Sequence, residues 1–181
     1  VIYGSSGKPV PGYELKLLDE QDNDIGIDEI GELIVNGPSS ALAYWGQKEK
    51  SRHTFRDGWT YTGDKYTMDT NGYYYYCGRT DDMIKVSGQW VSPFEVESTL
   101  LEHNMVSEAA VIGQNDENSL IKPKAFVVLK SGIEKSDDLA KDIKEFVKAK
   151  IARHKYPRWL EFVDNLPKTA TGKIQRYKLR S

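Results

Sequence analysis

The sequence has few of the residues that build metal centres and disulfide frameworks. Its 181 residues include one cysteine, Cys77, and three histidines, His53, His103 and His154. A single cysteine excludes an intramolecular disulfide, and the histidines lack the ligand spacing of a zinc site. We therefore predict no structural metal, and the composition suits a reducing cytoplasm.

The chain also lacks an excess of either charge and any long apolar run. Its 25 Lys and Arg against 27 Asp and Glu give a net charge of −2, so no overall basic field favours a nucleic acid or an anionic membrane. No apolar stretch approaches the ~20 residues that cross a bilayer, and the first residues have no export signal. With 39% hydrophobic and 29% charged residues, the chain should be globular, with a small molecule or a protein as partner.

The first 80 residues have the pattern of a small sheet or barrel. Segments rich in β-branched, leucine and aromatic residues alternate with turn sequences rich in Asp, Asn, Gly and Pro. The expected strands are YELKLLD (13–19), GELIVNG (31–37) and GYYYYCG (72–78). Residues 49–55 form the expected short helix, which ends before Asp57-Gly58.

From residue 83 onward the pattern becomes that of an α+β domain. Ser92, Pro93 and Glu95 have the spacing of a helix N-terminus with a capping box, and the helix that follows should bury Val96 and Leu100. The other expected elements are a strand pair around a turn in residues 83–92, strands at 107–113, 122–130 and 158–164, and an amphipathic helix within 136–152. The fold class is therefore α+β, with a β-rich part in residues 1–80 and an α+β domain in residues 81–181, joined at GRTDD (78–82).

PKTATGKIQR (167–176) is the segment most suggestive of chemistry, because it sets Lys173 behind a threonine-rich turn. A phosphate-binding loop of the form GxxxxGK[ST] needs glycine at 167 and a hydroxyl at 174, where the chain has Pro167 and Ile174. The alternative is a solvated basic face, since several cations occur with no acid among them: Lys168, Lys173, Arg176, Lys178 and Arg180.

Other polar segments have ordinary structural interpretations as well. YTGD (61–64) is typical of a turn capped by Asp64. Arg79 suits a surface ion pair with Asp81 or Asp82, a type of contact that contributes roughly 0–1 kcal/mol. Taken one at a time, these segments do not indicate a function.

Their order indicates more. GELIVNGPSSALAYW, WTYTGD, GRTDDMIKVSGQWVSPFEVE and PKTATGKIQR resemble, block by block, the C-terminal third of the adenylate-forming acyl-CoA synthetases, a superfamily that includes luciferases and the adenylation domains of peptide synthetases. The resemblance covers the whole chain. KVSGQWVSPFEVE, LIKPKAFVVLK and KYPRWLEFVDNLPKTATGKIQRYKLR look most like the benzoate–CoA ligase branch. Residues 1–80 would then end the large AMP-binding domain, and residues 81–181 would be the small lid domain.

The resemblance implies a reaction in two steps. A carboxylic acid, benzoate or another aromatic acid, joins the α-phosphorus of ATP with release of pyrophosphate, and the acyl group then passes to the thiol of coenzyme A. ATP, Mg²⁺ and coenzyme A are the implied cofactors. Trp90 stands where acetyl-CoA synthetases typically have arginine, which disfavours a close acetate relative.

The resemblance also assigns residues to the nucleotide chemistry. Lys173 matches the adenylation lysine, a cation that stabilises charge developing on the bridging oxygens, and its acetylation would silence the first step. Asp64 matches the carboxylate that accepts hydrogen bonds from both ribose hydroxyls. Arg79 matches an arginine that contacts the ribose or phosphate region, and Asp81 matches the hinge residue about which the small domain rotates.

Another set of residues is assigned to coenzyme A. Lys85, Ser87, Gly88 and Gln89 match the segment that lines the approach of the thiol, where a residue without a side chain lets the pantetheine arm run close to the backbone. Lys148 stands where relatives can offer a cation to the phosphates of coenzyme A.

The family's phosphate loop, acyl pocket and adenine-binding motif would align upstream of Val1. The resemblance therefore implies that this fragment is inactive alone, and that residues 1–80 expose apolar area that favours a homodimer. Two other functions stay open. One is an adenylation domain that loads a carrier protein, and the other is a non-catalytic binding module that uses the basic C-terminus on a nucleic acid or acidic partner, with steeply salt-dependent binding.

Overall fold

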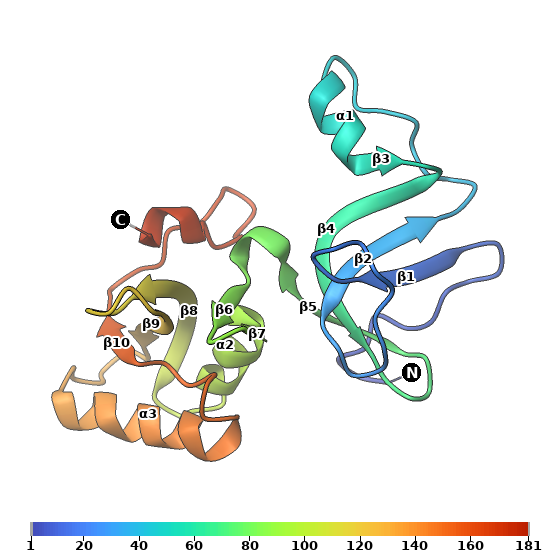
Figure 1. The fold of residues 1–181 in the computed structure, drawn as a ribbon. Coiled ribbons are helices and arrows are strands. Elements are labelled where there is room, and N and C mark those ends of the chain that lie inside the picture. The colour runs from blue at the N-terminus through green and yellow to red at the C-terminus, as the bar shows by residue number, and fades with distance from the viewer. Residues whose placement is uncertain (1, 181) are drawn as a thin grey trace. The chain divides into compact units, whose positions relative to one another are not determined.

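The computed structural model describes residues 2–180 (Figure 1). The chain divides between Asp81 and Asp82 into two compact units. The sequence places this boundary one residue earlier. Within residues 2–180, no helix combines the length and the apolar character that a membrane crossing requires.

The first unit is an antiparallel sheet with one short helix. The strands are β1 (Glu14–Leu18), β2 (Gly31–Asn36), β3 (Phe55–Arg56), β4 (Trp59–Met68) and β5 (Tyr74–Arg79), and the helix is α1 (Lys48–Thr54). β1 pairs with β2, and the long strand β4 pairs with β2, β3 and β5 (Figure 1). A small core of Leu17, Leu33 and Tyr74 lies against this sheet. The three predicted strands and the predicted helix of this unit are confirmed.

β4 corrects the interpretation of YTGD (61–64) as a turn. The strand continues through these residues because they pair with β2 and β5, and the φ of +69° at Gly63 and the register shift between Lys65 and Tyr66 are irregularities within that pairing. A glycine of positive φ and a bulge let a strand bend without ending. Asp64 is consequently a strand residue with a fixed partner on β5.

The second unit is an α+β sandwich. Its elements are β6 (Ile84–Val86), β7 (Gln89–Val91), α2 (Pro93–Leu101), β8 (Val106–Asn115), β9 (Ile121–Leu129), α3 (Asp137–Lys150) and β10 (Trp159–Phe162). Short 3₁₀ turns occupy Thr80–Asp82, at the boundary, and Arg176–Leu179. β8 and β9 pair antiparallel, and β10 joins β9 in parallel after the crossover through α3. The hairpin, helices and strands predicted for this part of the chain are confirmed.

Helix α2 begins where its capping sequence predicts. The Ser92 hydroxyl accepts a hydrogen bond from the N–H of Glu95, and Pro93 occupies the first turn. Such a cap typically contributes about 1 kcal/mol. Val96 and Leu100 are fully buried, which fixes the face that α2 turns to the sheet.

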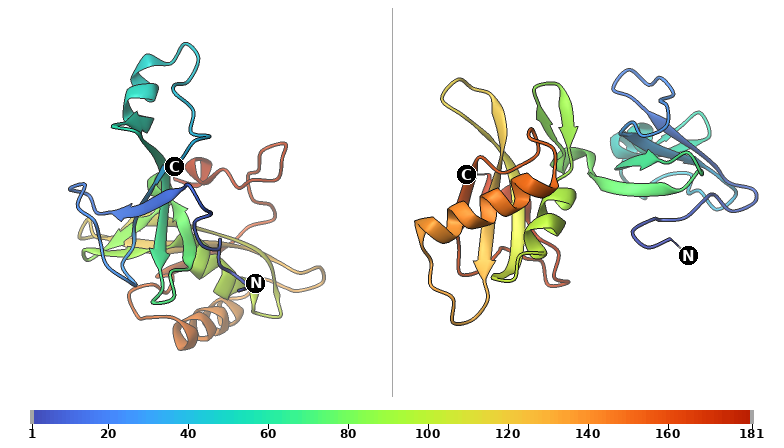
Figure 2. Two further views of the ribbon diagram at one scale, coloured as in Figure 1. Left: turned by 90° about the vertical axis from the view of Figure 1, so that its right-hand side faces the viewer. Right: turned by 90° about the horizontal axis from the view of Figure 1, so that it is seen from below.

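The sheet of the second unit is buried on both faces, because successive residues of a strand point to opposite sides. One face packs on the helices: Val111 of β8 and Val127 of β9 belong to the same core cluster as residues of α2 and α3. Figure 2 shows α3 running along the sheet. The other face, with Ala110 and Phe126, is covered by side chains from the C-terminal segment: Val163, Leu166, Ile174 and Leu179.

Apolar side chains are exposed in the first unit, as the resemblance implies. Leu42 is 95% exposed and Trp45 is 100% exposed, both in the loop that leads to α1. Dimerisation through this surface stays a prediction.

Candidate functional site

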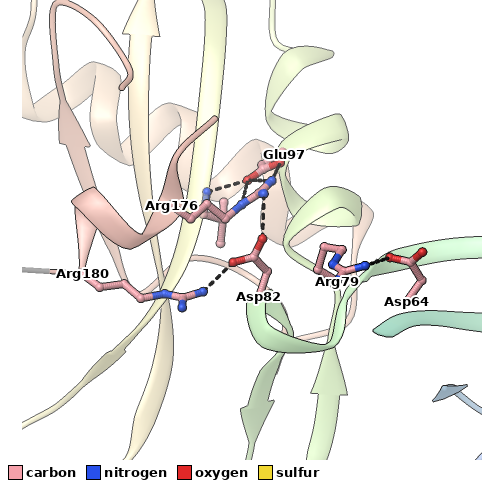
Figure 3. Close-up of polar contacts among 7 residues, drawn as sticks. Asp64, Arg79, Asp82, Glu97, Arg176 and Arg180 are labelled. Carbon is pink, nitrogen blue, oxygen red and sulfur yellow. Dashed lines mark hydrogen bonds and ion pairs between the residues drawn. The ribbon is translucent and has the colours of Figure 1, made fainter. Parts of the chain in front are cut away.

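Asp64 and Arg79 form an ion pair on neighbouring strands of the first unit. They are register partners on β4 and β5, and Nη1 of Arg79 lies 3.0 Å from Oδ1 of Asp64 (Figure 3). The same nitrogen donates to the carbonyl of Thr62 at 3.0 Å. Both side chains border solvent, at 52% exposure for Arg79 and 29% for Asp64. The suggestion that Arg79 pairs with Asp81 or Asp82 is wrong, because sheet register sets its partner.

The backbone around Gly63 makes room for this pair. A Cβ at Gly63 would lie 3.0 Å from Nη2 of Arg79, and the positive φ already disfavours a side chain there. The N–H of Gly63 donates to the carboxylate of Glu32 at 3.2 Å, and the N–H of Asp64 donates to the hydroxyl of Thr62 at 3.1 Å. The carboxylate of Asp64 is therefore positioned by β4, and the guanidinium of Arg79, on β5, is positioned by its contacts with Asp64 and with the Thr62 carbonyl of β4.

The β6–β7 hairpin presents the predicted Ser87-Gly88 turn to solvent. Both residues have positive φ, +49° and +85°, which is the backbone of a type I′ hairpin turn. A Cβ added at Gly88 would meet nothing within 4 Å, so the turn is open on that side. Nζ of Lys85 lies 5.0 Å from the ring centroid of Trp90, and Gln89 is exposed.

A basic pocket of about 150 Å³ adjoins this turn. Its polar lining is dominated by cationic and imidazole groups, with no carboxylate among the residues that form it. The lining residues are Val86, Ser87, Lys122, Pro123, Arg153, His154, Tyr156 and Arg158. Lys122, Arg153 and Arg158 give the pocket a positively charged lining, which favours an anionic group.

Lys148 lies on α3 and contacts this region through an aromatic ring. Its ammonium is 2.8 Å from the carboxylate of Glu145, one turn earlier on the helix, and 5.8 Å from the ring centroid of Tyr156, which lines the basic pocket. The side chain is 35% exposed. Lys148 is thus a neighbour of the pocket wall.

Lys173 stands near the tip of a short turn built by backbone hydrogen bonds. The N–H of Thr169 donates to the carbonyl of Lys173 at 2.8 Å, and Lys168 and Ile174 form a bridge pair. The N–H of Lys173 donates to the Thr169 hydroxyl at 3.1 Å, and Gly172 has a φ of +83°. The Lys173 side chain is exposed, and no carboxylate within residues 2–180 pairs with its ammonium. The turn offers a cation to solvent.

Both ends of this turn are fixed to the second unit. On one side, Lys168 pairs with Glu108 of β8 at 2.7 Å and Leu166 is buried. On the other side, Ile174 packs on the sheet, and Arg176 follows two residues later. Residues 171–173 of the turn are therefore exposed, while the residues on either side of the turn are bound to the second unit.

Arg176 is the centre of an ion-pair network (Figure 3). Its guanidinium lies 2.7 Å from the carboxylate of Glu97 on α2 and 3.2 Å from that of Asp82. Arg180 also binds Asp82, at 2.7 Å. Glu97 in turn accepts the N–H of Val111 at 2.8 Å, an edge group of β8 that has no strand partner on that side. The network joins four separate segments of the second unit: its start, α2, β8 and the 3₁₀ turn with Arg176.

This network corrects the description of the C-terminal cations as a solvated basic face. Lys168, Arg176 and Arg180 are each paired with a carboxylate, and the Arg176 side chain is only 18% exposed. The sequence did not indicate Glu97, and it suggested Asp82 only as a surface partner of Arg79. The one signal for a buried charge was that Glu97 lies on the same helix face as the buried residues Val96 and Leu100.

Burial controls the ionisation of the network. Burial raises the pKa of Glu97 above its ordinary value, although the Arg176 guanidinium and the Val111 N–H oppose this shift. Burial lowers the pKa of Arg176, but the carboxylates of Glu97 and Asp82 raise it further, so that it lies above the usual range. The guanidinium is therefore the permanent charge of the pair.

Neither a metal-binding cluster nor a fixed hinge position stands out from the geometry. Residues 2–180 contain no group of three or more His, Cys, Asp and Glu side chains that could hold a metal ion. Asp81 is exposed, lies in the 3₁₀ turn Thr80–Asp82, and is the last residue of the first unit.

The chain is similar to known enzymes in sequence and in structure. Residues 95–173 match the family model described as AMP-binding enzyme C-terminal domain. A benzoate–CoA ligase of Thauera aromatica is 59% identical over 100% of this chain and 34% of that protein. A 4-hydroxybenzoate–CoA/benzoate–CoA ligase of Rhodopseudomonas palustris is 55% identical over 99% of this chain and 34% of that protein.

A solved structure agrees with this result. The crystal structure of an anthranilate–CoA ligase in complex with anthranoyl-AMP matches with a TM-score of 0.92 and 54% identity, over 99% of this chain and 35% of that one. The chain spans about a third of the length of the relatives it matches. The match identifies residues 95–173 as an AMP-binding enzyme C-terminal domain.

Proposed function

We propose that the chain is part of an ATP-dependent acyl-CoA ligase that adenylates an aromatic carboxylic acid, benzoate, and transfers the acyl group to coenzyme A. The observation that carries this proposal is the 59% identity, along the whole chain, to a protein named as a benzoate–CoA ligase. The bound anthranoyl-AMP of the similar structure supports an acyl adenylate as the intermediate. Residues 1–181 alone are expected to be inactive, because they correspond to about a third of such an enzyme.

The proposed roles of the nucleotide residues fit their surroundings. Asp64 uses one carboxylate oxygen for Arg79, which leaves the second oxygen and the exposed edge of the pair for ribose hydroxyls. Lys173 supplies an ammonium that no carboxylate within residues 2–180 neutralises, which suits the approach of a carboxylate to a phosphate in the first step. Mg²⁺ would enter with the phosphates of ATP, since residues 2–180 offer it no cluster of their own. Asp81 is the proposed hinge.

The proposed coenzyme A segment is the Ser87-Gly88 turn with its flanking residues Lys85 and Gln89. The open space at Gly88 supports a close approach of the pantetheine arm to the backbone. The basic pocket beside the turn supports binding of a phosphate group of coenzyme A. Lys148 would add a positive charge next to this pocket, because its ammonium lies over the ring of Tyr156 in the pocket wall. In this proposal the thiol and phosphate ends of coenzyme A use neighbouring parts of one unit.

The test is benzoate-dependent exchange between ATP and pyrophosphate by the full-length protein. We expect exchange with benzoate, little exchange with acetate, and collapse of the exchange in Lys173→Ala. Thioester formation from supplied benzoyl-AMP and coenzyme A should survive in this variant. If Lys173→Ala exchanges as fast as the parent, Lys173 is not the adenylation cation, and if no aromatic acid supports exchange, the substrate class is wrong.

A further inference from the structure

The side chain of Lys173 is exposed, so its position depends on the backbone turn that carries it. A lysine ammonium sits on a flexible four-carbon stem, and within residues 2–180 no carboxylate holds it in place. A cation that must meet a reacting group needs to be placed to within a fraction of an ångström, since a shift of 1 Å can lower a rate about a hundredfold. Something outside the side chain must therefore fix the turn.

The two stems of the turn are fixed by contacts of unequal strength. Lys168 and Glu108 are 38% and 39% exposed, and ion pairs at such sites contribute little. Arg176 is 18% exposed, and its nitrogens lie 2.7, 2.9 and 3.1 Å from the Glu97 oxygens. A planar guanidinium bound through several nitrogens has one orientation, unlike a point charge. The C-terminal stem is the better anchored one.

The partners of Arg176 are themselves held by further contacts. Glu97 lies on α2, is 8% exposed, and accepts the edge N–H of Val111, which orients its carboxylate. Asp82 is the first residue of the second unit and receives a second guanidinium from Arg180. Through Glu97 and Asp82, Arg176 therefore links the turn to α2 and to the start of the unit. Glu97 extends this link to β8 through the N–H of Val111.

We propose that Arg176, held by Glu97 and Asp82, is a positioning residue that fixes the turn of residues 168–174 so that Lys173 is presented for adenylation. This inference rests on the proposed adenylation role of Lys173. The inference predicts different effects on the two half-reactions, because only adenylation uses Lys173. A network that served stability alone would affect both half-reactions equally.

The first experiment measures the turn itself and needs no substrate. Hydrogen exchange of the full-length protein is followed in Arg176→Lys, which keeps the charge but loses the fork, and in Glu97→Gln, which keeps an acceptor for Val111. We expect faster exchange at the amides of Gly172 and Gln175, which donate to Thr169 and Pro167, with β8 and β9 still protected. Unchanged exchange in the turn would overturn the proposal, and so would a loss of protection spread evenly over the unit.

The second experiment measures both half-reactions in the same two variants. We expect kcat for ATP–pyrophosphate exchange to fall at least about tenfold, with KM for ATP and benzoate within about twofold, while thioester formation from supplied benzoyl-AMP stays within about twofold. Lys178→Ala, an exposed cation of the same 3₁₀ turn, should change neither. An equal loss in both half-reactions would show a purely structural role. If Lys173→Ala abolishes exchange while Arg176→Lys does not, this inference fails and the proposed function stands.

Discussion

The guanidinium of Arg79 lies 3.0 Å from the carboxylate of Asp64, its register partner across the β4–β5 ladder. The pair uses one carboxylate oxygen of Asp64, and both side chains are partly exposed to solvent. In the proposed function, this carboxylate binds the ribose of ATP. The hydrogen bonds of a charged acceptor typically contribute about 1.5–3 kcal/mol each.

Asp64→Asn is therefore expected to weaken binding of ATP and not of the acid. The KM for ATP in the exchange reaction should rise about tenfold or more, and the KM for benzoate should stay within about twofold. Steady-state exchange at varied ATP measures this. Asp24→Asn, which removes a carboxylate from an exposed pair with Lys16 in the same unit, is the control. An equal rise in both KM values would argue against the ribose contact.

Gly88→Ala is expected to slow thioester formation and leave adenylation unaffected. A Cβ at Gly88 would point into open space that the pantetheine arm is proposed to use. The rate from supplied benzoyl-AMP should fall about tenfold, in line with the loss of close backbone approach. Gly132→Ala is a matched control, since Gly132 has a φ of +82° and equally open surroundings. If the two variants behave alike, backbone strain explains the effect.

Removal of Arg176 alone is expected to destabilise the second unit strongly. Arg176→Met leaves Glu97 buried without its cation, and breaking a buried ion pair in this way costs about 3–5 kcal/mol. Adding Glu97→Gln should restore much of the stability, because no unpaired charge then remains and the Val111 N–H keeps an acceptor. Protection of the β8 and β9 amides against hydrogen exchange measures both effects. A double variant less stable than Arg176→Met would contradict this account.

The stability of the first unit is expected to decrease in acid because of Asp69. The N–H of Tyr73, with smaller contributions from the Tyr75 hydroxyl and the N–H of Asn71, holds the pKa of Asp69 below its ordinary value. A lowered carboxyl pKa contributes stability that is fully present above the unfolded value of about 3.9 and is lost as the pH falls through the folded pKa. Acid should therefore weaken the β4–β5 turn.

The measurement compares the parent with Asp69→Asn from pH 6 to pH 2, through exchange protection of β4 and β5 amides corrected for intrinsic rates. The parent should be the more stable above pH 4, and the difference should shrink toward pH 2. Glu49→Gln, which removes a largely exposed carboxylate on α1, controls for the change in net charge. A difference that grows in acid would refute the assignment.

The sequence was sufficient where structure is set by neighbouring residues. Ser92, Pro93 and Glu95 define the start of α2 locally, and the spacing of Val96 and Leu100 identifies its buried face. Strands β8 and β9 were equally visible as apolar runs. In each case the information lies within a few residues of the element that it specifies.

The sequence was insufficient where partners come from elsewhere in the chain. β4 contains Gly63 and Asp64, which favour turns, and only its pairing with β2 and β5 makes it a strand. Arg176 lies in a run of cations, so that solvent exposure was a natural interpretation. Its acidic partner is 79 residues away, on a helix whose face could be predicted but whose neighbour could not.

The ion pairs of Asp82 also set an order of assembly during synthesis. The partners of Asp82 are the guanidinium groups of Arg176 and Arg180, which are synthesised 94 and 98 residues after it. Until the ribosome has released those residues, the carboxylates of Asp82 and Glu97 have no Arg176 to neutralise them, and the Lys173 turn has no anchored stem. The second unit therefore reaches this electrostatic balance only when residues 176–180 have joined it, so that their loss would remove the ion pairs of Asp82, its first residue.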